Sequence, residues 1–101
     1  MTQWQTKFAV DFWTNQLRQN KKMDEHHIIR FIESLTEIIT KRKPSAICTV
    51  STPQMHLLLA LKDAELSEDA IPLSHINLVF ISDGSIQIYE NEKWTKHQEP
   101  T

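Results

Sequence analysis

The stretch Glu25–Arg42, EHHIIRFIESLTEIITKR, decides the fold. Its apolar residues recur every three or four positions, which is typical of one face of an α-helix that other elements must cover. They are Ile28, Phe31, Ile32, Leu35, Ile38 and Ile39. Asp24 stands at the N-cap position, and Pro44 ends the segment because proline cannot continue a helix. We therefore predict a helix over 25–42 that packs against the rest of the chain.

The preceding segment, 1–19, has the same spacing and a broader, aromatic-rich apolar face. That face consists of Trp4, Phe8, Ala9, Phe12, Trp13 and Leu17. Only residues 20–23 separate it from the next helix, and so short a link between two helices favours an antiparallel pair. The first forty or so residues are therefore predicted to form a helical hairpin.

The second half of the chain combines short strands with one helix. Residues 46–50 are rich in β-branched side chains and predict a strand, and the leucine-rich segment 54–65 predicts a helix. The segments 76–81 and 86–89 alternate in character and flank Asp83-Gly84. An Asp-Gly pair between two alternating runs is the strongest local signal for a β-hairpin.

These elements add up to one α+β domain over 1–95, followed by a polar tail over 96–101. We expect an N-terminal antiparallel helical hairpin packed on a small three-stranded mixed sheet, with one further helix. A crossover through the third helix would bring the first strand beside the C-terminal hairpin.

Composition narrows the possible functions. The chain has 101 residues, 40% of them hydrophobic, and a formal net charge of −2, which gives no bulk attraction to nucleic acid or an anionic membrane. Its one glycine, Gly84, excludes the glycine-rich phosphate loops, and we expect no cofactor. One cysteine, Cys48, and no long apolar run favour an intracellular, cytoplasmic protein.

No pattern of reactive side chains indicates catalysis or metal binding. His26 and His27 are adjacent on the predicted helix and point about 100° apart, so they cannot chelate one ion together. Cys48 lies in an apolar strand, where a cysteine is usually an inert core residue. The acidic residues of 63–69 are better explained as a solvated face than as an acid–base pair. We therefore predict no catalytic and no metal-binding residues.

The face of the β-hairpin that points away from the helices is the predicted binding surface. It comprises His75, Asn77, Val79, Gln87, Tyr89 and Trp94. Exposed tyrosine and tryptophan side chains often anchor protein partners, although plain packing explains Tyr89 and Trp94 about as well.

The order of these motifs resembles the BTG/Tob antiproliferative domain. Residues 10–18 fit that family's V-x-F-x(4)-L-R, and 23–35 are similar to its V-S-E-x-x-L-x-x-F-x(3)-L. Residues 46–50 are similar to its R-C-I-R-I strand, 65–69 to its G-L-S turn, and 83–90 to its D-G-S-I-x-V-x-Y-E ending. The resemblance implies an α+β fold and an adapter without enzymatic activity that recruits a deadenylase-type partner.

Both signature boxes of that family are shortened here, so the chain would be a divergent or minimal member. The loop after the second helix is reduced to 41–45, and the stretch between Pro72 and Asp83 is about a dozen residues shorter than the family's spacing. The tryptophan and the aspartate of the family's deadenylase contact have no counterpart.

Three other interpretations stay open. The chain could be a small cytosolic immunity or inhibitor protein whose acidic residues 63–69 face a basic toxin. It could be a small metal-binding enzyme that uses His26, His27, Cys48 or His56. An edge strand near Trp94 could also pair two copies of the chain, alongside any of these functions.

Overall fold

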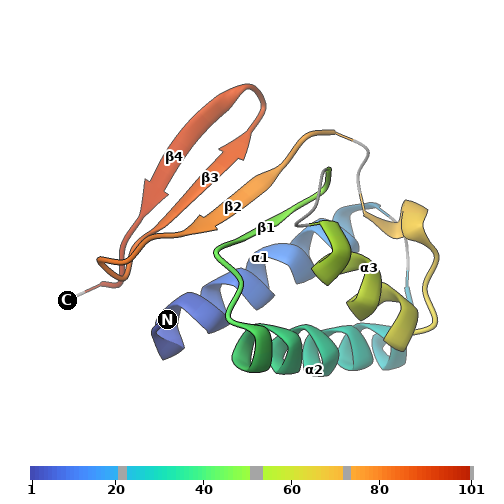
Figure 1. Ribbon diagram of the computed structural model, residues 1–101. Coiled ribbons are helices and arrows are strands. Elements are labelled where there is room, and N and C mark those ends of the chain that lie inside the picture. The colour runs from blue at the N-terminus through green and yellow to red at the C-terminus, as the bar shows by residue number, and fades with distance from the viewer. Residues whose placement is uncertain (21–22, 51–53, 72–73, 101) are drawn as a thin grey trace.

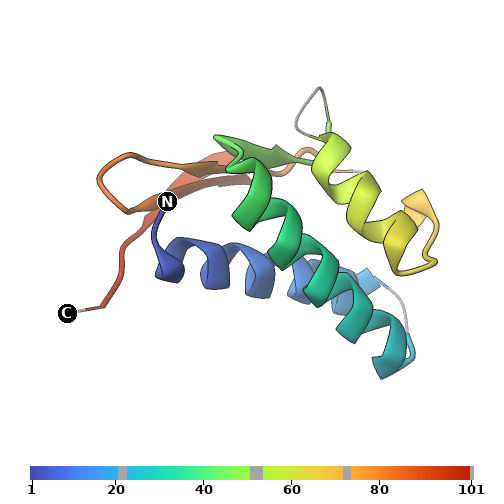
Figure 2. The same cartoon turned by 60° about the horizontal axis from the view of Figure 1, so that its bottom comes forward.

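The computed structural model describes residues 1–20, 23–50, 54–71 and 74–100, and within them it has an α+β fold (Figure 1). The elements in chain order are α1 (Gln3–Asn20), α2 (Glu25–Arg42), β1 (Ala46–Cys48), α3 (Gln54–Asp63), the 3₁₀ turn η1 (Glu68–Ala70), β2 (Asn77–Phe80), β3 (Ile86–Glu90) and β4 (Lys93–His97). Seen from below, α1 lies under the sheet, α2 lies beside α1, and α3 flanks α2 (Figure 2).

The helix predicted from its apolar stripe is α2, and its bounds are those expected. The inner line of the stripe, Ile28, Phe31, Leu35 and Ile39, is buried. The remaining members, Ile32 and Ile38, lie half-buried at the margins of the same face. Asp24 has the extended backbone of an N-cap residue, but its side chain makes no capping hydrogen bond.

The first helix forms the predicted antiparallel partner of α2, with Ala9, Trp13 and Leu17 buried between them and the sheet. Its start is fixed by a capping box. The backbone N–H of Gln5 donates to the Thr2 hydroxyl at 3.0 Å, and the Thr2 N–H donates to the Gln5 side-chain oxygen at 2.9 Å. Two N–H groups that the first helical turn would leave unpaired are thereby satisfied. The predicted turn between the helices includes 21–22, which lie outside the described residues.

The third helix packs mainly on α2 and also contacts β1. Ser34 donates to the Asp63 carboxylate at 2.6 Å, and the ring of His27 lies 2.8 Å from the Ala64 carbonyl oxygen. The helix ends at Asp63, two residues earlier than predicted, because Glu65 has a positive φ of 60°. That backbone turn lets the Leu66 N–H reach the Leu61 carbonyl at 2.8 Å, which closes the helix in a Schellman motif.

The sheet is the main correction to the predicted fold: it has four strands, all antiparallel, in the order β1-β2-β3-β4, where three strands in a mixed sheet were expected. The chain that leaves β1 returns to the same end of that strand, so β2 runs back along it. Thr49 fixes this return, because its N–H donates to the Ile76 carbonyl and its hydroxyl accepts from the Ile76 N–H, both at 2.9 Å. Beyond Cys48 these two bonds take the place of regular hydrogen bonds between the strands. The observed strand β1 therefore ends at Cys48, two residues before the end of the predicted strand.

The hairpin predicted at Asp83-Gly84 is confirmed, and Phe80 and Ile86 are direct cross-strand neighbours. Gly84, at φ 92°, donates its N–H to the Ile81 carbonyl at 3.0 Å, and the Ile81 N–H donates to the Ser85 carbonyl at 3.0 Å. The loop is therefore a three-residue type, a turn followed by a left-handed glycine.

The fourth strand was not expected. Part of it, Lys96 and His97, falls in the segment predicted as a polar tail, but it pairs with β3 along its whole length. A two-residue turn connects them, and its residues Asn91 and Glu92 both have positive φ, 55° and 63°. Such a turn usually has glycine at its second position, so the Asn-Glu pair is only a weak sequence signal for a β-hairpin.

One hydrophobic core joins the helices to the inner face of the sheet. The largest fully buried side chains in the described part of the chain include Trp13, Leu17, Phe31, Leu35, Ile47, Leu78 and Ile86. Among the same residues, none of the helices combines the length and apolar character needed to cross a bilayer.

Candidate functional site

The candidate site is the outer face of the sheet, which points away from α1. Its centre is a row of three aromatic rings, His75, Tyr89 and Trp94, which we call the aromatic row. The ring centroids of His75 and Tyr89 are 4.9 Å apart, and those of Tyr89 and Trp94 are 5.3 Å apart. Both pairs are tilted, at 48° and 57°, a geometry that aromatic pairs prefer over face-to-face stacking.

Strand register brings the row together. Asn77 on β2 lies opposite Tyr89 on β3, which lies opposite Trp94 on β4. Alternate residues of a strand share a face. The next pair on the same face as Asn77 and Tyr89 is therefore Val79 and Gln87. All six residues of the predicted binding surface are therefore neighbours on one face or at its edge.

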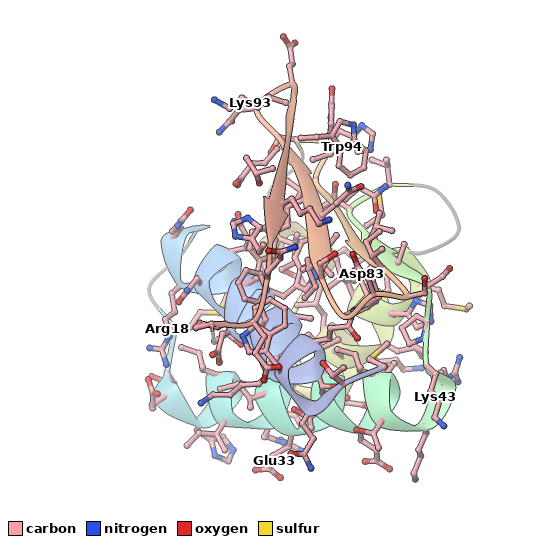
Figure 3. The ribbon with its side chains drawn as sticks, turned by 90° about the vertical axis from the view of Figure 1, so that its left-hand side faces the viewer. Arg18, Glu33, Lys43, Asp83, Lys93 and Trp94 are labelled. Atoms are coloured by element: carbon pink, nitrogen blue, oxygen red, sulfur yellow. The ribbon has the colours of Figure 1, made fainter. Side chains whose placement is uncertain are left out.

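The opposite face of the same strands is covered by the helices. Leu78, Ile86 and Ile88 are buried there, and the ring of Phe8 on α1 lies 5.1 Å from that of His97 on β4. Lys93 and Trp94 accordingly project to opposite sides of the β3–β4 hairpin (Figure 3).

Exposure distinguishes the aromatic row from the core. Trp94 is 52% exposed, Tyr89 is half-buried, and His75 is exposed. An indole this exposed leaves a large apolar area in water, which packing within the described chain does not cover.

A buried acceptor lies beside the row. The side-chain oxygen of Asn77 is inaccessible to solvent and has no hydrogen-bond partner among the described residues. A buried polar atom left without a partner costs about 1–3 kcal/mol. Because solvent does not reach this oxygen, a partner that binds the face does not reach it either unless the side chains over it move.

The charges at the margin of the face are paired. The Lys96 ammonium lies 3.5 Å from the Asp83 carboxylate. The pKa of Asp83 is lowered chiefly by the hydroxyl of Ser85, which donates to the carboxylate at 2.5 Å, then by the Ser85 N–H at 2.8 Å, and further by Lys96. Asp83 is thus held as a carboxylate that orders the hairpin loop.

Of the side chains considered for metal binding, His26, His27 and His56 lie on helices, whereas Cys48 on β1 lies opposite Asn77 and therefore on the same side of the sheet as the aromatic row. The rings of His26 and His27 are 5.8 Å apart, and His27 contacts the Ala64 carbonyl. Cys48 is a free thiol and is 2% exposed. Within 1–20, 23–50, 54–71 and 74–100, no three or more His, Cys, Asp or Glu residues are grouped so as to hold a metal ion.

Two hollows in the helical layer were not foreseen from the sequence. One, of about 600 Å³, lies between the start of α1 and the end of α2, and charges of both signs line it, so it indicates no particular ligand class. The other, of about 630 Å³, lies between α3 and the turn that follows. The first is lined in part by Lys7, Val10, Asp11, Ile32, Ile39 and Lys43, and the second by Met55, Leu58, Leu59, Glu65, Leu66 and Glu68.

Comparisons of the chain with protein-family models, with curated proteins and with solved structures found no match. The resemblance to the BTG/Tob domain therefore rests on the sequence motifs quoted above.

Proposed function

We propose that this protein is a non-enzymatic adapter or regulator that binds another protein through the outer face of its sheet. The observation that carries the proposal is the aromatic row, in which Trp94 is 52% exposed and its ring packs against the ring of Tyr89. Tryptophan and tyrosine dominate the binding energy of many protein interfaces, particularly where neighbouring side chains hold them in place.

The row suits binding because its rings are ordered before a partner arrives. Each ring packs on the next, so Trp94 loses little side-chain freedom when a partner covers it. The face also offers the exposed side-chain amide of Gln87 for hydrogen bonding. A partner with an apolar pocket for the indole and a nearby donor would fit this face.

The resemblance to the BTG/Tob domain supports the same class of function. The segments that carry that family's deadenylase contact are shortened in this chain. A deadenylase-type partner would therefore have to bind through the aromatic row instead.

Capture of partners by tagged protein, read by quantitative mass spectrometry, tests the proposal. Val79→Asp places a charge at the centre of the face, and Tyr89→Ala removes the support of Trp94. We expect each variant to lose at least tenfold of any partner that the wild type enriches. Ile29→Asp is the matched control, since Ile29 is 48% exposed on α2 and lies outside the face.

Urea unfolding of each variant separates lost binding from lost structure. If Val79→Asp and Tyr89→Ala unfold at the same urea concentration as Ile29→Asp and still retain every partner, the surface assignment is wrong.

A second candidate function is supported by the hollow beside α3. Met55 is 47% exposed there, and the hollow is lined by Glu65, Glu68 and Lys62, with Glu65 lying 3.3 Å from Arg30. An apolar hollow lined by two carboxylates and one ammonium group would favour a basic partner, as in an immunity or inhibitor protein. Loss of partners from Met55→Asp, with full retention by Tyr89→Ala, would favour this function over the first.

A further inference from the structure

The strand β4 forms an edge of the sheet, because it pairs with β3 and with no other described strand. In a two-residue hairpin the flanking pair, here Glu90 and Lys93, exchanges backbone hydrogen bonds, and the bonded pairs then alternate along the strands. Thr95 therefore directs its backbone groups at Ile88 on β3. Trp94 and Lys96 direct theirs outward, to the open edge.

An open edge with unpaired N–H and C=O groups is a template for a further strand. Two copies of β4 can pair antiparallel about a two-fold axis, and the register centred on Thr95 aligns the whole of Lys93–His97 with its copy. In that register Trp94 lies opposite Lys96 of the second copy, and Lys93 lies opposite His97.

The neighbouring registers fit less well. A register centred on Lys96 would set that ammonium against its own copy, and like charges placed directly opposite are destabilising. A register centred on Trp94 would need Glu92 in an extended conformation, but Glu92 belongs to the turn and has a φ of 63°.

The side chains of the Thr95-centred register are complementary. Trp94 and Lys96 are on the outer face, so each indole would meet the ammonium of the other copy, and a cation over a tryptophan ring is attracted to it. Lysines often protect an edge strand from pairing. Here Lys96 lies 3.5 Å from Asp83, which partly balances its charge, and its side chain is still 47% exposed, so it can also face the indole of the second copy.

We propose that two copies of this chain associate through β4 in the register centred on Thr95, and so form one antiparallel sheet that runs through both. The outward backbone groups of Trp94 and Lys96 exchange hydrogen bonds with those of the second copy. The outer faces become continuous, with an aromatic row on each side of the axis. This association goes beyond the proposed function and does not depend on it, because its hydrogen bonds come from the edge of the sheet, although it shares the Trp94 side chain with the proposed binding face.

Sedimentation equilibrium over a range of protein concentrations tests the association. The wild type should be a concentration-dependent dimer. Lys96→Pro removes an outward N–H but no bond to β3, so it should raise the dissociation constant at least tenfold. Lys96→Ala keeps that N–H and should have a smaller effect. A wild type that sediments as a monomer throughout, or a Lys96→Pro variant that dimerises as tightly as wild type, would overturn the proposal.

A disulfide tests the register. In a Cys48→Ser background, Thr95→Cys places two thiols across the axis in a non-hydrogen-bonded pair, where the Cα atoms are about 4.5 Å apart and a disulfide can form. His97→Cys is the control, because its thiols would be about 13 Å apart along the strands. Rapid oxidation of Thr95→Cys alone is expected, whereas equal or faster cross-linking of His97→Cys would contradict the register. Partner capture by Lys96→Pro then reports on the proposed function separately.

Discussion

The side-chain amide of Gln5 donates to the carbonyl oxygen of Ser85 at 2.8 Å, across 80 positions of sequence, and donates to that of Ile81 at 2.9 Å. Gln5 is 2% exposed, so neither carbonyl would find water in its place. One side chain therefore completes the capping box of α1 and holds the loop of the β2–β3 hairpin against that helix.

Replacing Gln5 by alanine should lower the free energy of unfolding by about 1–3 kcal/mol, because the hydrogen bonds from its amide to the Ile81 and Ser85 carbonyls are lost and each is worth about 0.5–1.5 kcal/mol. Urea unfolding followed by tryptophan fluorescence measures the change. Gln3→Ala is the matched control, since Gln3 is exposed in the same helical turn, and it should change stability by less than about 0.5 kcal/mol. Equal effects of the two substitutions would contradict this role for Gln5.

Glu92→Gly should stabilise the β3–β4 hairpin. Asn91 and Glu92 both have positive φ, and a side chain at the second position is strained where glycine is not. We expect a gain of about 0.5–1 kcal/mol, read as a higher midpoint of thermal unfolding. Glu92→Ala keeps the Cβ atom and should give no such gain. A lower midpoint for the glycine variant than for the alanine variant would argue against this turn.

Asp83 should make the stability of the folded protein depend on pH in the acid range. Its pKa is lowered in the folded protein, mainly by Ser85, so the carboxylate stabilises the fold fully above its unfolded pKa of about 3.9. That contribution is lost as the pH falls through the lowered pKa. Thermal unfolding at a series of pH values should therefore show wild type and Asp83→Asn converging in strong acid. Ser85→Ala removes the main donor and should weaken the same pH dependence; an unchanged dependence would refute the assignment.

Thr49→Val should cost about 1–3 kcal/mol of folding free energy, although the two side chains have nearly the same shape. The Thr49 hydroxyl accepts from the Ile76 N–H and donates to the Ser74 carbonyl at 2.8 Å, and valine can do neither. Hydrogen exchange of the Ile76 amide gives a local readout, since its protection should fall more than that of Leu78. Unchanged protection of Ile76 would contradict the role of the hydroxyl.

Most of the fold could be predicted from local patterns in the sequence. The apolar stripe of α2 and the Asp-Gly loop at 83–84 each specify their structure through neighbours only a few residues away. The order of the strands could not be predicted in the same way, because β2 runs antiparallel to β1 through contacts between Thr49 and Ile76, which are distant in sequence.

The candidate site, too, could be predicted in part from local patterns in the sequence and in part not. Alternation in β2 and β3 was enough to assign Asn77, Val79, Gln87 and Tyr89 to one face. That Trp94 joins them depends on the turn at Asn91–Glu92, whose residues gave little signal. The bonds from Gln5 to the hairpin were also missed, although the T-x-x-Q capping box at 2–5 was present in the sequence.

The most direct test of the binding surface is site-specific photo-cross-linking in native lysate. A photoreactive phenylalanine at Gln87 would sit at the centre of the outer face, and the same residue at Glu33 would sit on the exposed side of α2 (Figure 3). We expect a discrete cross-linked partner from position 87 that disappears when Trp94→Ala is added, and none from position 33. The same adduct from position 33, with none from position 87, would contradict it.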